Sequence, residues 1–164
     1  MLKQLVGIIF ILFSTITYSK AFSLESVGSS LLGGDSDSSF NMDDTLGMQD
    51  QILGDYMKGS ADFNKALVII MDAYDLKDES SKLQAQQAFL DGSDISSSNF
   101  NDNMKEVAIL HKDSVKIIEN KISSGASQDA AGKAKLSTAY PPFFSGLVKI
   151  GLAAKLGIDT FKQI

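Results

Sequence analysis

Apolar residues recur every three or four positions along most of residues 43–162, and this spacing is typical of amphipathic α-helices that pack in a bundle. The longest such stretch starts near Asp43, whose side chain can cap a helix, and continues to about Asp75. Gly59 and Ser60 interrupt its apolar row, and glycine costs about 1 kcal/mol relative to alanine inside a helix. We therefore predict a long first helix with a kink or a close helix contact near Gly59.

Three or four further helices are predicted to follow. Their expected ranges are about 79–92, 100–124, 128–140 and 142–162, and Gly125 is expected to stop the second of these helices. Pro141 and Pro142 are expected to separate the last two helices. Each proline disfavours helical geometry for the residue before it, whereas proline itself is accepted in the first turn of a new helix. No strand-like alternation of useful length occurs. The predicted fold class is all-α: a single-domain helical bundle of four to five helices, mostly antiparallel because the links are short.

The first residues have the layout of a secretory signal peptide. Lys3 provides a positive start, residues 5–13 are apolar, and Ala21 ends a small-residue cleavage pattern. We predict cleavage after Ala21, with cleavage after Ser23 as the second choice. The alternative is an uncleaved membrane anchor, although the apolar run is shorter than the stretch of about 20 residues that spans a bilayer. The predicted organisation is a signal peptide (1–21), a disordered, acidic Ser/Gly/Asp-rich leader (22–42) and a helical bundle domain (43–164).

The amino-acid composition limits the kinds of molecule that the protein is expected to bind. The chain has no Cys and no Arg, and without the signal peptide it keeps 13 Lys against 20 acidic residues, a formal charge of −7. Nucleic acid is not an expected partner, because its binding usually requires a basic face. The lack of Cys and of Asn-x-Ser/Thr sequons favours a bacterial exported protein, periplasmic or extracellular. Residues 22–57 are acidic and residues 105–164 basic. We interpret these charges as solvated faces; the alternatives are that the two parts attract each other within one fold or between copies.

The predicted helix 142–162 is apolar on nearly every side. Its apolar surface includes Phe144, Leu147, Leu152 and Leu156. Three roles fit such a helix: the buried centre of the core, an interface for self-association or a partner, and contact with a membrane surface. We favour the core role because the other helices need a common centre. That role predicts that Leu152→Asp unfolds the domain, since an unpaired buried charge is very costly.

Polar residues on apolar helix faces provide one candidate site. His111, the only histidine, falls on the apolar side of the third predicted helix, while Tyr56 and Ser60 lie midway along the first. If these helices are antiparallel neighbours, the three residues meet in one layer. They then form either a satisfied polar cluster, since a buried imidazole needs hydrogen-bond partners, or the polar spot of a ligand cavity.

No catalytic, cofactor or metal site is predicted. A single His without Cys cannot form the usual zinc sites. Two segments that resemble calcium loops, starting at Asp35 and Asp91, lack required residues at key positions. No hydrolase nucleophile motif and no phosphate-binding loop follows the signal peptide. We therefore expect a protein that is not an enzyme and needs no cofactor.

The sequence thus favours an exported soluble helical-bundle protein that acts by binding or assembly. It would hold a small apolar ligand between helices, dock on an envelope protein, or self-associate. The alternative is a membrane-active secreted effector that uses helix 142–162.

Overall fold

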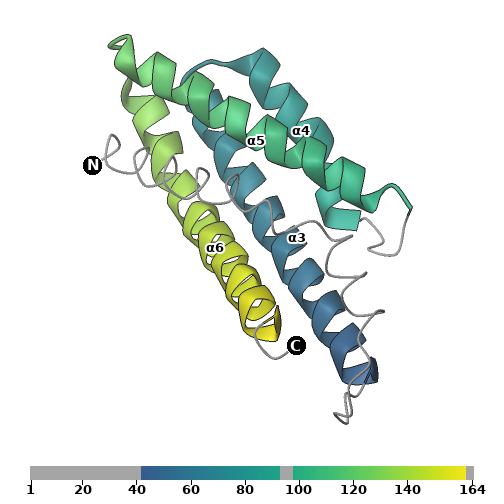
Figure 1. Ribbon diagram of the computed structural model, residues 1–164. Coiled ribbons are helices and arrows are strands. Elements are labelled where there is room, and N and C mark those ends of the chain that lie inside the picture. Colours follow the sequence, from purple (N-terminus) through teal and green to yellow (C-terminus); the bar gives the residue numbers. More distant parts are fainter. Residues whose placement is uncertain (1–41, 93–97, 162–164) are drawn as a thin grey trace. The chain divides into compact units, whose positions relative to one another are not determined.

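A computed structural model of the chain describes residues 42–92 and 98–161, and every regular element in these ranges is an α-helix. The helices are α3 (Met42–Ala73), α4 (Lys77–Gly92), α5 (Phe100–Ser123) and α6 (Ala130–Phe161). Consecutive helices run in opposite directions (Figure 1). The predicted all-α, mostly antiparallel bundle is confirmed, with four helices in the described residues. The predicted signal peptide and nearly all of the predicted leader lie outside them.

Local signals in the sequence end two of the helices. After α3, Asp75 adopts a left-handed conformation (φ 56°), and Leu76 N–H donates to the Met71 carbonyl at 2.9 Å. Aspartate is one of the few residues other than glycine that tolerate this geometry. After α5, Gly125 has a φ of 79°, and its N–H donates to the Ile122 carbonyl. The predicted stop at Gly125 is therefore confirmed.

The predicted break at the two prolines is wrong, because Pro141 and Pro142 lie inside the continuous helix α6. Each proline removes one backbone donor, so the carbonyls of Ser137 and Thr138 lose their partners within the helix. Both of these residues are exposed, so water can bond to the two carbonyls and the interruption is tolerated. The segments predicted as helices 128–140 and 142–162 are one element.

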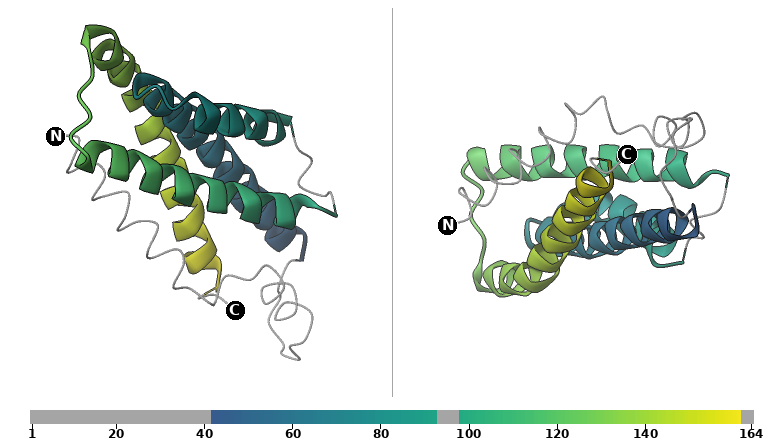
Figure 2. Two further views of the ribbon diagram at one scale, coloured as in Figure 1. Left: turned by 90° about the horizontal axis from the view of Figure 1, so that it is seen from above. Right: turned by 60° about the horizontal axis from the view of Figure 1, so that its bottom comes forward.

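The centre of the bundle is α3, and the other three helices lie around it (Figure 2). Most of the side chains without exposed surface come from this helix: Phe63, Asn64, Ala66, Leu67 and Met71 are 0% exposed. Next to them, Ala61 belongs to a buried cluster with Leu90, Phe100, Met104 and Val107 of α4 and α5. The C-terminal helix is therefore not the central helix that the sequence led us to favour. The broad apolar stripe of α3 takes that place.

Candidate functional site

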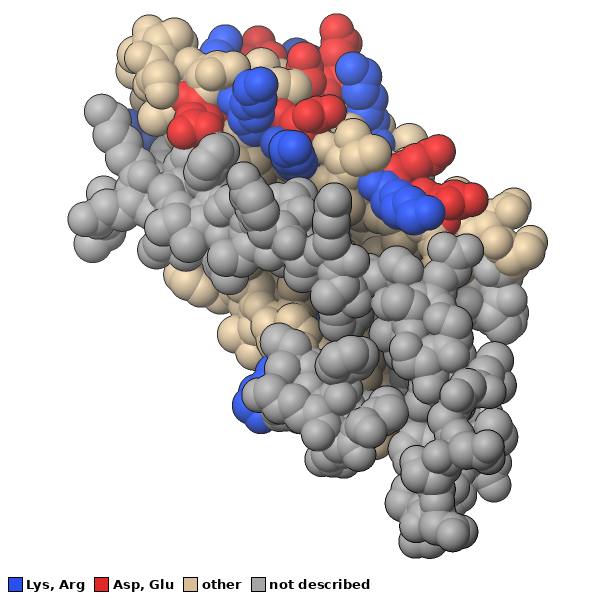
Figure 3. All heavy atoms as spheres, in the orientation of Figure 1, with Lys and Arg blue, Asp and Glu red and all other residues tan. Residues whose placement is uncertain are grey.

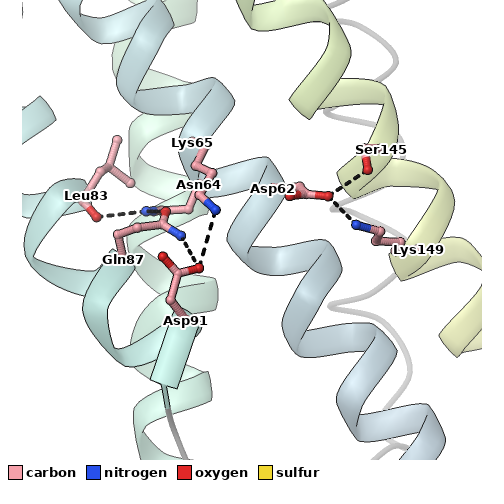
Figure 4. A network of polar contacts seen from close by, with 8 residues as sticks. All are labelled: Asp62, Asn64, Lys65, Leu83, Gln87, Asp91, Ser145 and Lys149. Carbon is pink, nitrogen blue, oxygen red and sulfur yellow. Dashed lines mark hydrogen bonds and ion pairs between the residues drawn. The ribbon is translucent and has the colours of Figure 1, made fainter.

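Asn64 lies in the middle of α3 and joins three helices by hydrogen bonds. Its Nδ2 donates to the Leu83 carbonyl and to Oε1 of Gln87, both on α4 and both at 2.8 Å. Its Oδ1 is 3.1 Å from Nε2 of His111 on α5. Figure 4 shows the α4 side of this arrangement. One fully buried amide thus uses its donor and acceptor sides to hold two neighbouring helices against α3.

From Asn64 the polar contacts continue to the surface. Gln87 Nε2 donates to Oδ1 of Asp91 at 3.0 Å, and the exposed Lys65 lies 3.4 Å from the same oxygen. His111 is 3% exposed at the inner end, whereas Asp91 is exposed at the outer end. The result is an unbroken chain of hydrogen bonds from the core to the solvent (Figure 4).

The orientation of Asn64 determines the protonation of the histidine. A backbone carbonyl such as that of Leu83 can only accept, so Asn64 must present its NH₂ group to it and its oxygen to the ring. His111 therefore carries a proton on Nε2. Burial lowers the pKa of His111 to about 4, so the ring is neutral at neutral pH. The Phe63 ring packs against the imidazole, with the centroids 5.3 Å apart and the planes at 63°.

The three polar residues of the predicted ligand site are only partly brought together. Ser60 is buried and Tyr56 half-buried; burial raises the pKa of the Tyr56 phenol, and a side-chain hydrogen bond with Ser60 partly offsets this rise. His111 meets α3 one turn further on, at Asn64, which the sequence analysis missed. The sequence feature that could have identified Asn64 is its position four residues after Ser60, inside the apolar stripe of the first helix. The bonds between His111 and Asn64 and between Tyr56 and Ser60 are those expected of a satisfied polar cluster.

A row of apolar side chains lies on the outer side of α6. Its members, the α6 row, are Tyr140 (38% exposed), Phe144 (53%), Val148 (59%) and Leu152 (53%). Their spacing of four residues places them one helical turn apart, along about 18 Å of the helix. The Tyr140 and Phe144 rings stack, with their centroids 6.5 Å apart and 19° between their planes. The row is thus continuous on the surface.

Of the four residues named from the sequence as core or interface, Phe144 and Leu152 belong to the α6 row, and Leu147 and Leu156 are half-buried beside it. An exposed Leu152 contradicts the expectation that Leu152→Asp unfolds the domain, because a carboxylate there would keep its water. The interface role is consistent with this exposure, whereas the central core role is not.

The inner side of α6 packs closely on α3 at two glycines. A Cβ atom on Gly146 would lie 2.7 Å from the Phe63 backbone nitrogen, and one on Gly59 would lie 2.9 Å from the Ile150 nitrogen. Both distances are shorter than side chains permit, so only glycine allows the two backbones to approach this closely. The close helix contact predicted at Gly59 is thus present.

Beside this contact an ionic cluster fixes the rotation of α6. Asp62 Oδ2 accepts hydrogen bonds from Ser145 Oγ at 2.6 Å and from Lys149 Nζ at 2.5 Å (Figure 4). Partial burial raises the pKa of Asp62. The hydrogen bonds from Lys149 and Ser145 and the charges of Lys149 and Lys65 lower it by more than burial raises it, so the pKa lies below its ordinary value. The carboxylate is therefore ionised at neutral pH. This anchor keeps the α6 row facing outward.

Within residues 42–92 and 98–161, no group of three or more His, Asp or Glu is placed to hold a metal ion. In the same ranges no helix has the length and apolar character needed to cross a membrane. The candidate calcium loop at Asp35 lies outside these residues, and the one at Asp91 lies partly outside them. Comparison of the chain with known protein families, curated proteins and solved structures found no match.

Proposed function

We propose that the protein is an exported helical bundle that acts by binding rather than by catalysis, and that the α6 row is its binding surface. The observation that carries the proposal is the row itself, in which Phe144, Val148 and Leu152 are each more than half exposed. The other exposed large apolar residues in the described ranges are Met48 on α3 and Ile109 on α5, each on a different helix. Contiguous exposed apolar surface marks interaction sites, whereas single exposed residues are ordinary.

Export through the predicted signal peptide would bring this surface to the periplasm or outside a bacterial cell. Docking on an envelope component therefore fits both the location and the exposed row. A small apolar ligand near Tyr56, Ser60 and His111 has less support, because Asn64 holds the histidine and Ser60 bonds to the tyrosine. Native mass spectrometry of the exported protein would reveal such a ligand as additional mass.

Site-specific photo-crosslinking in the exporting cell tests the proposal. A benzophenone amino acid would replace Val148 in one variant and Ile109 in another, and these residues are matched at 59% and 60% exposure. We expect discrete adducts, to protein or lipid, from position 148 and only background from position 109. Equal adduct patterns from the two positions would contradict the proposal.

A further inference from the structure

The outer side of α6 carries the residue spacing with which two helices pack side by side. Exposed residues recur along it at alternating intervals of four and three positions: Ser137, Pro141, Phe144, Val148, Gly151 and Lys155. We call these six residues the outer seam, and Tyr140 and Leu152 of the α6 row flank it. Helices that cross at about 20° in bundles and coiled coils pack through this spacing. The helix thus has one packing side toward α3 and a second one toward the solvent.

The two halves of the α6 row differ in kind. Tyr140 and Phe144 carry aromatic rings, whereas Val148 and Leu152 are aliphatic. An antiparallel second copy, related by a twofold axis at the level of residue 146, would place Phe144 opposite Val148. The same axis would place Tyr140 opposite Leu152, and each contact would occur twice by symmetry. A parallel pair would place ring against ring, so the row complements itself in the antiparallel direction.

Pro141 and Gly151 of the outer seam match in the same arrangement, because the twofold axis places them opposite each other. A Cβ atom built on Gly151 would have nothing within 4 Å, so this position leaves open space on the surface. The proline ring of the second copy can occupy that space. A residue without a side chain also lets the two helices approach each other at this level.

The charged residues at the two ends of the α6 row complement each other across this axis. Lys133 lies seven residues before the first member of the row, and Asp159 lies in α6 seven residues after the last. The axis therefore places Lys133 opposite Asp159 of the second copy, once at each end of the contact. Lys133 is exposed and forms no ion pair with any other described residue. Opposite charges at both ends favour the antiparallel pair, whereas a parallel pair would bring like charges together.

The other lysines of α6 do not oppose this pairing. Lys149 forms its ion pair within the bundle, with α3. Lys135 lies five helical turns before the buried Ala153 and therefore on the side of α6 away from the row. Lys155 belongs to the outer seam, and the axis places it opposite Ser137 rather than opposite another lysine.

We propose that two copies of the protein pair through the α6 row and the outer seam, as an antiparallel dimer whose twofold axis passes at the level of residue 146. This inference rests on the proposed function of the row and names a second copy as its partner. Each bundle keeps its own core, because Gly59, Gly146 and the Asp62–Lys149 pair hold the inner side of α6 on α3. The dimer therefore forms from folded bundles, and its population depends on the protein concentration.

The outer side of α5 offers control positions, because its surface is of a different kind. Acidic and basic side chains alternate along it, with Asp102, Lys105 and Glu106 near its start and Lys112 and Asp113 further on. In Figure 3 this mixed region forms the upper face, where red and blue side chains lie next to each other. A mixed surface is what solvation alone requires. Substitutions on α5 should therefore leave the pairing unchanged.

Disulfide formation between single-cysteine variants tests the direction of pairing. The chain has no Cys, so one introduced thiol can bond only to another copy. In the proposed dimer residue 140 lies opposite residue 152 but about 18 Å along the axis from residue 140 of the other copy, beyond the reach of a disulfide. We expect Tyr140→Cys and Leu152→Cys to form a mixed disulfide dimer when combined, and neither to form one alone above the background of Ile109→Cys. Dimers from each variant alone without the mixed species, or no dimer above background in any sample, would overturn the proposed pairing.

Exchange of the end charges tests the register. Lys133→Glu would place two negative charges opposite each other at both ends of the contact and should weaken dimerisation about tenfold. Adding Asp159→Lys to this variant restores opposite charges and should restore most of the affinity. Lys116→Glu on α5 changes the net charge by the same amount and should leave the dimer nearly unchanged. Sedimentation velocity over a range of concentrations is the measurement, and equal weakening by Lys116→Glu or no recovery in the double variant would contradict the register.

Leu152→Asp tests the apolar contact itself, because this variant is expected to remain folded. It should sediment as a monomer, whereas Ile109→Asp on α5 should remain dimeric. An unsubstituted protein that stays monomeric at millimolar concentration overturns the dimer. If benzophenone at position 148 then still forms adducts with another protein or with lipid, the proposed function holds and that molecule replaces the second copy. If position 148 gives only background adducts as well, both proposals fail.

Discussion

Asn64 and His111 show how two buried polar residues can satisfy each other inside an apolar core. The Leu83 carbonyl and Gln87 orient the amide, and the amide in turn selects the Nε2–H form of the ring. Asn64 and Phe63, which contact the ring, carry no negative charge. A second proton on His111 would therefore place an uncompensated charge in the core.

We predict that His111 makes the fold less stable below pH 6.5. In the folded protein its pKa is about 4, whereas the unfolded chain takes up the proton near the ordinary value of 6.5. Between these two values the unfolded state binds more protons, so the free energy of unfolding decreases as the pH falls. We expect a loss of about 2 kcal/mol between pH 7 and pH 4.5, measured by urea denaturation.

His111→Gln is the matched variant, because glutamine can still donate to Asn64 Oδ1 but does not titrate. Its loss of stability over the same interval should be smaller by about 2 kcal/mol. Asp62 interferes little, because its pKa lies below 3.8 and its effect appears at still lower pH. Equal losses in the two proteins would exclude His111 as the responsible group.

Asn64→Asp should destabilise the protein by about 3 kcal/mol at pH 7. The carboxylate cannot donate to the Leu83 carbonyl or to Gln87, and it places a buried charge against both oxygens. Asn101→Asp, at an exposed position of α5, is the control and should change the stability by only about 0.5 kcal/mol. Unchanged urea midpoints for both variants would show that Asn64 does not join the helices.

The contact between α3 and α6 decides which side of the C-terminal helix meets solvent. Gly59 and Gly146 bring the backbones together, and Asp62 with Lys149 holds the rotation. Ala139, Phe143 and Ala153 are buried on the inner side as a consequence. The large side chains of the α6 row are left outside.

Gly146→Ala should destabilise the bundle by about 2 kcal/mol, because its Cβ would lie 2.8 Å from the Gly59 carbonyl oxygen as well as close to Phe63. Gly151→Ala is the control on the same helix, since nothing lies within 4 Å of the added atom. It should stabilise the helix by up to about 1 kcal/mol. Thermal or urea unfolding of both variants is the measurement, and a stabilising Gly146→Ala would contradict the close contact.

Two adjacent residues test the rotation of α6 directly. Leu152 is 53% exposed and Ala153 is 1% exposed. Leu152→Asp should therefore cost only about 1 kcal/mol, whereas Ala153→Asp should cost more than about 3 kcal/mol because it buries an unpaired charge. Circular dichroism during urea denaturation compares them. If Leu152→Asp unfolds the protein and Ala153→Asp does not, the opposite side of the helix is buried.

For the molecule as a whole, export remains a prediction from residues 1–21. The intact mass of the protein recovered after export should correspond to a chain that starts at Phe22, because Ala21 ends the favoured cleavage pattern. A start at Leu24 would indicate cleavage after Ser23 instead. A mass that still includes Met1 would support the uncleaved anchor.

Much of the helical organisation could be read from local patterns. The period of apolar residues identified the region of each helix, and Gly125 marked the end of one because its left-handed conformation terminates a helix. The break at Pro141 and Pro142 could not be judged in this way. Whether a helix continues through proline depends on whether the carbonyls that lose their helical partners can bond to water. Here these are the carbonyls of Ser137 and Thr138, which are exposed residues.

The sequence alone determined that the chain forms an antiparallel helical bundle and that Gly59 permits a close contact, because period and residue size act locally. The tertiary structure decided which helix is central, that His111 pairs with Asn64, and that Phe144, Val148 and Leu152 face outward. A helix that is apolar on nearly every side has no sequence signal for the face it buries. The face that α6 buries depends on the surface against which it packs. Here Gly59 and Asp62 of α3 determine that face.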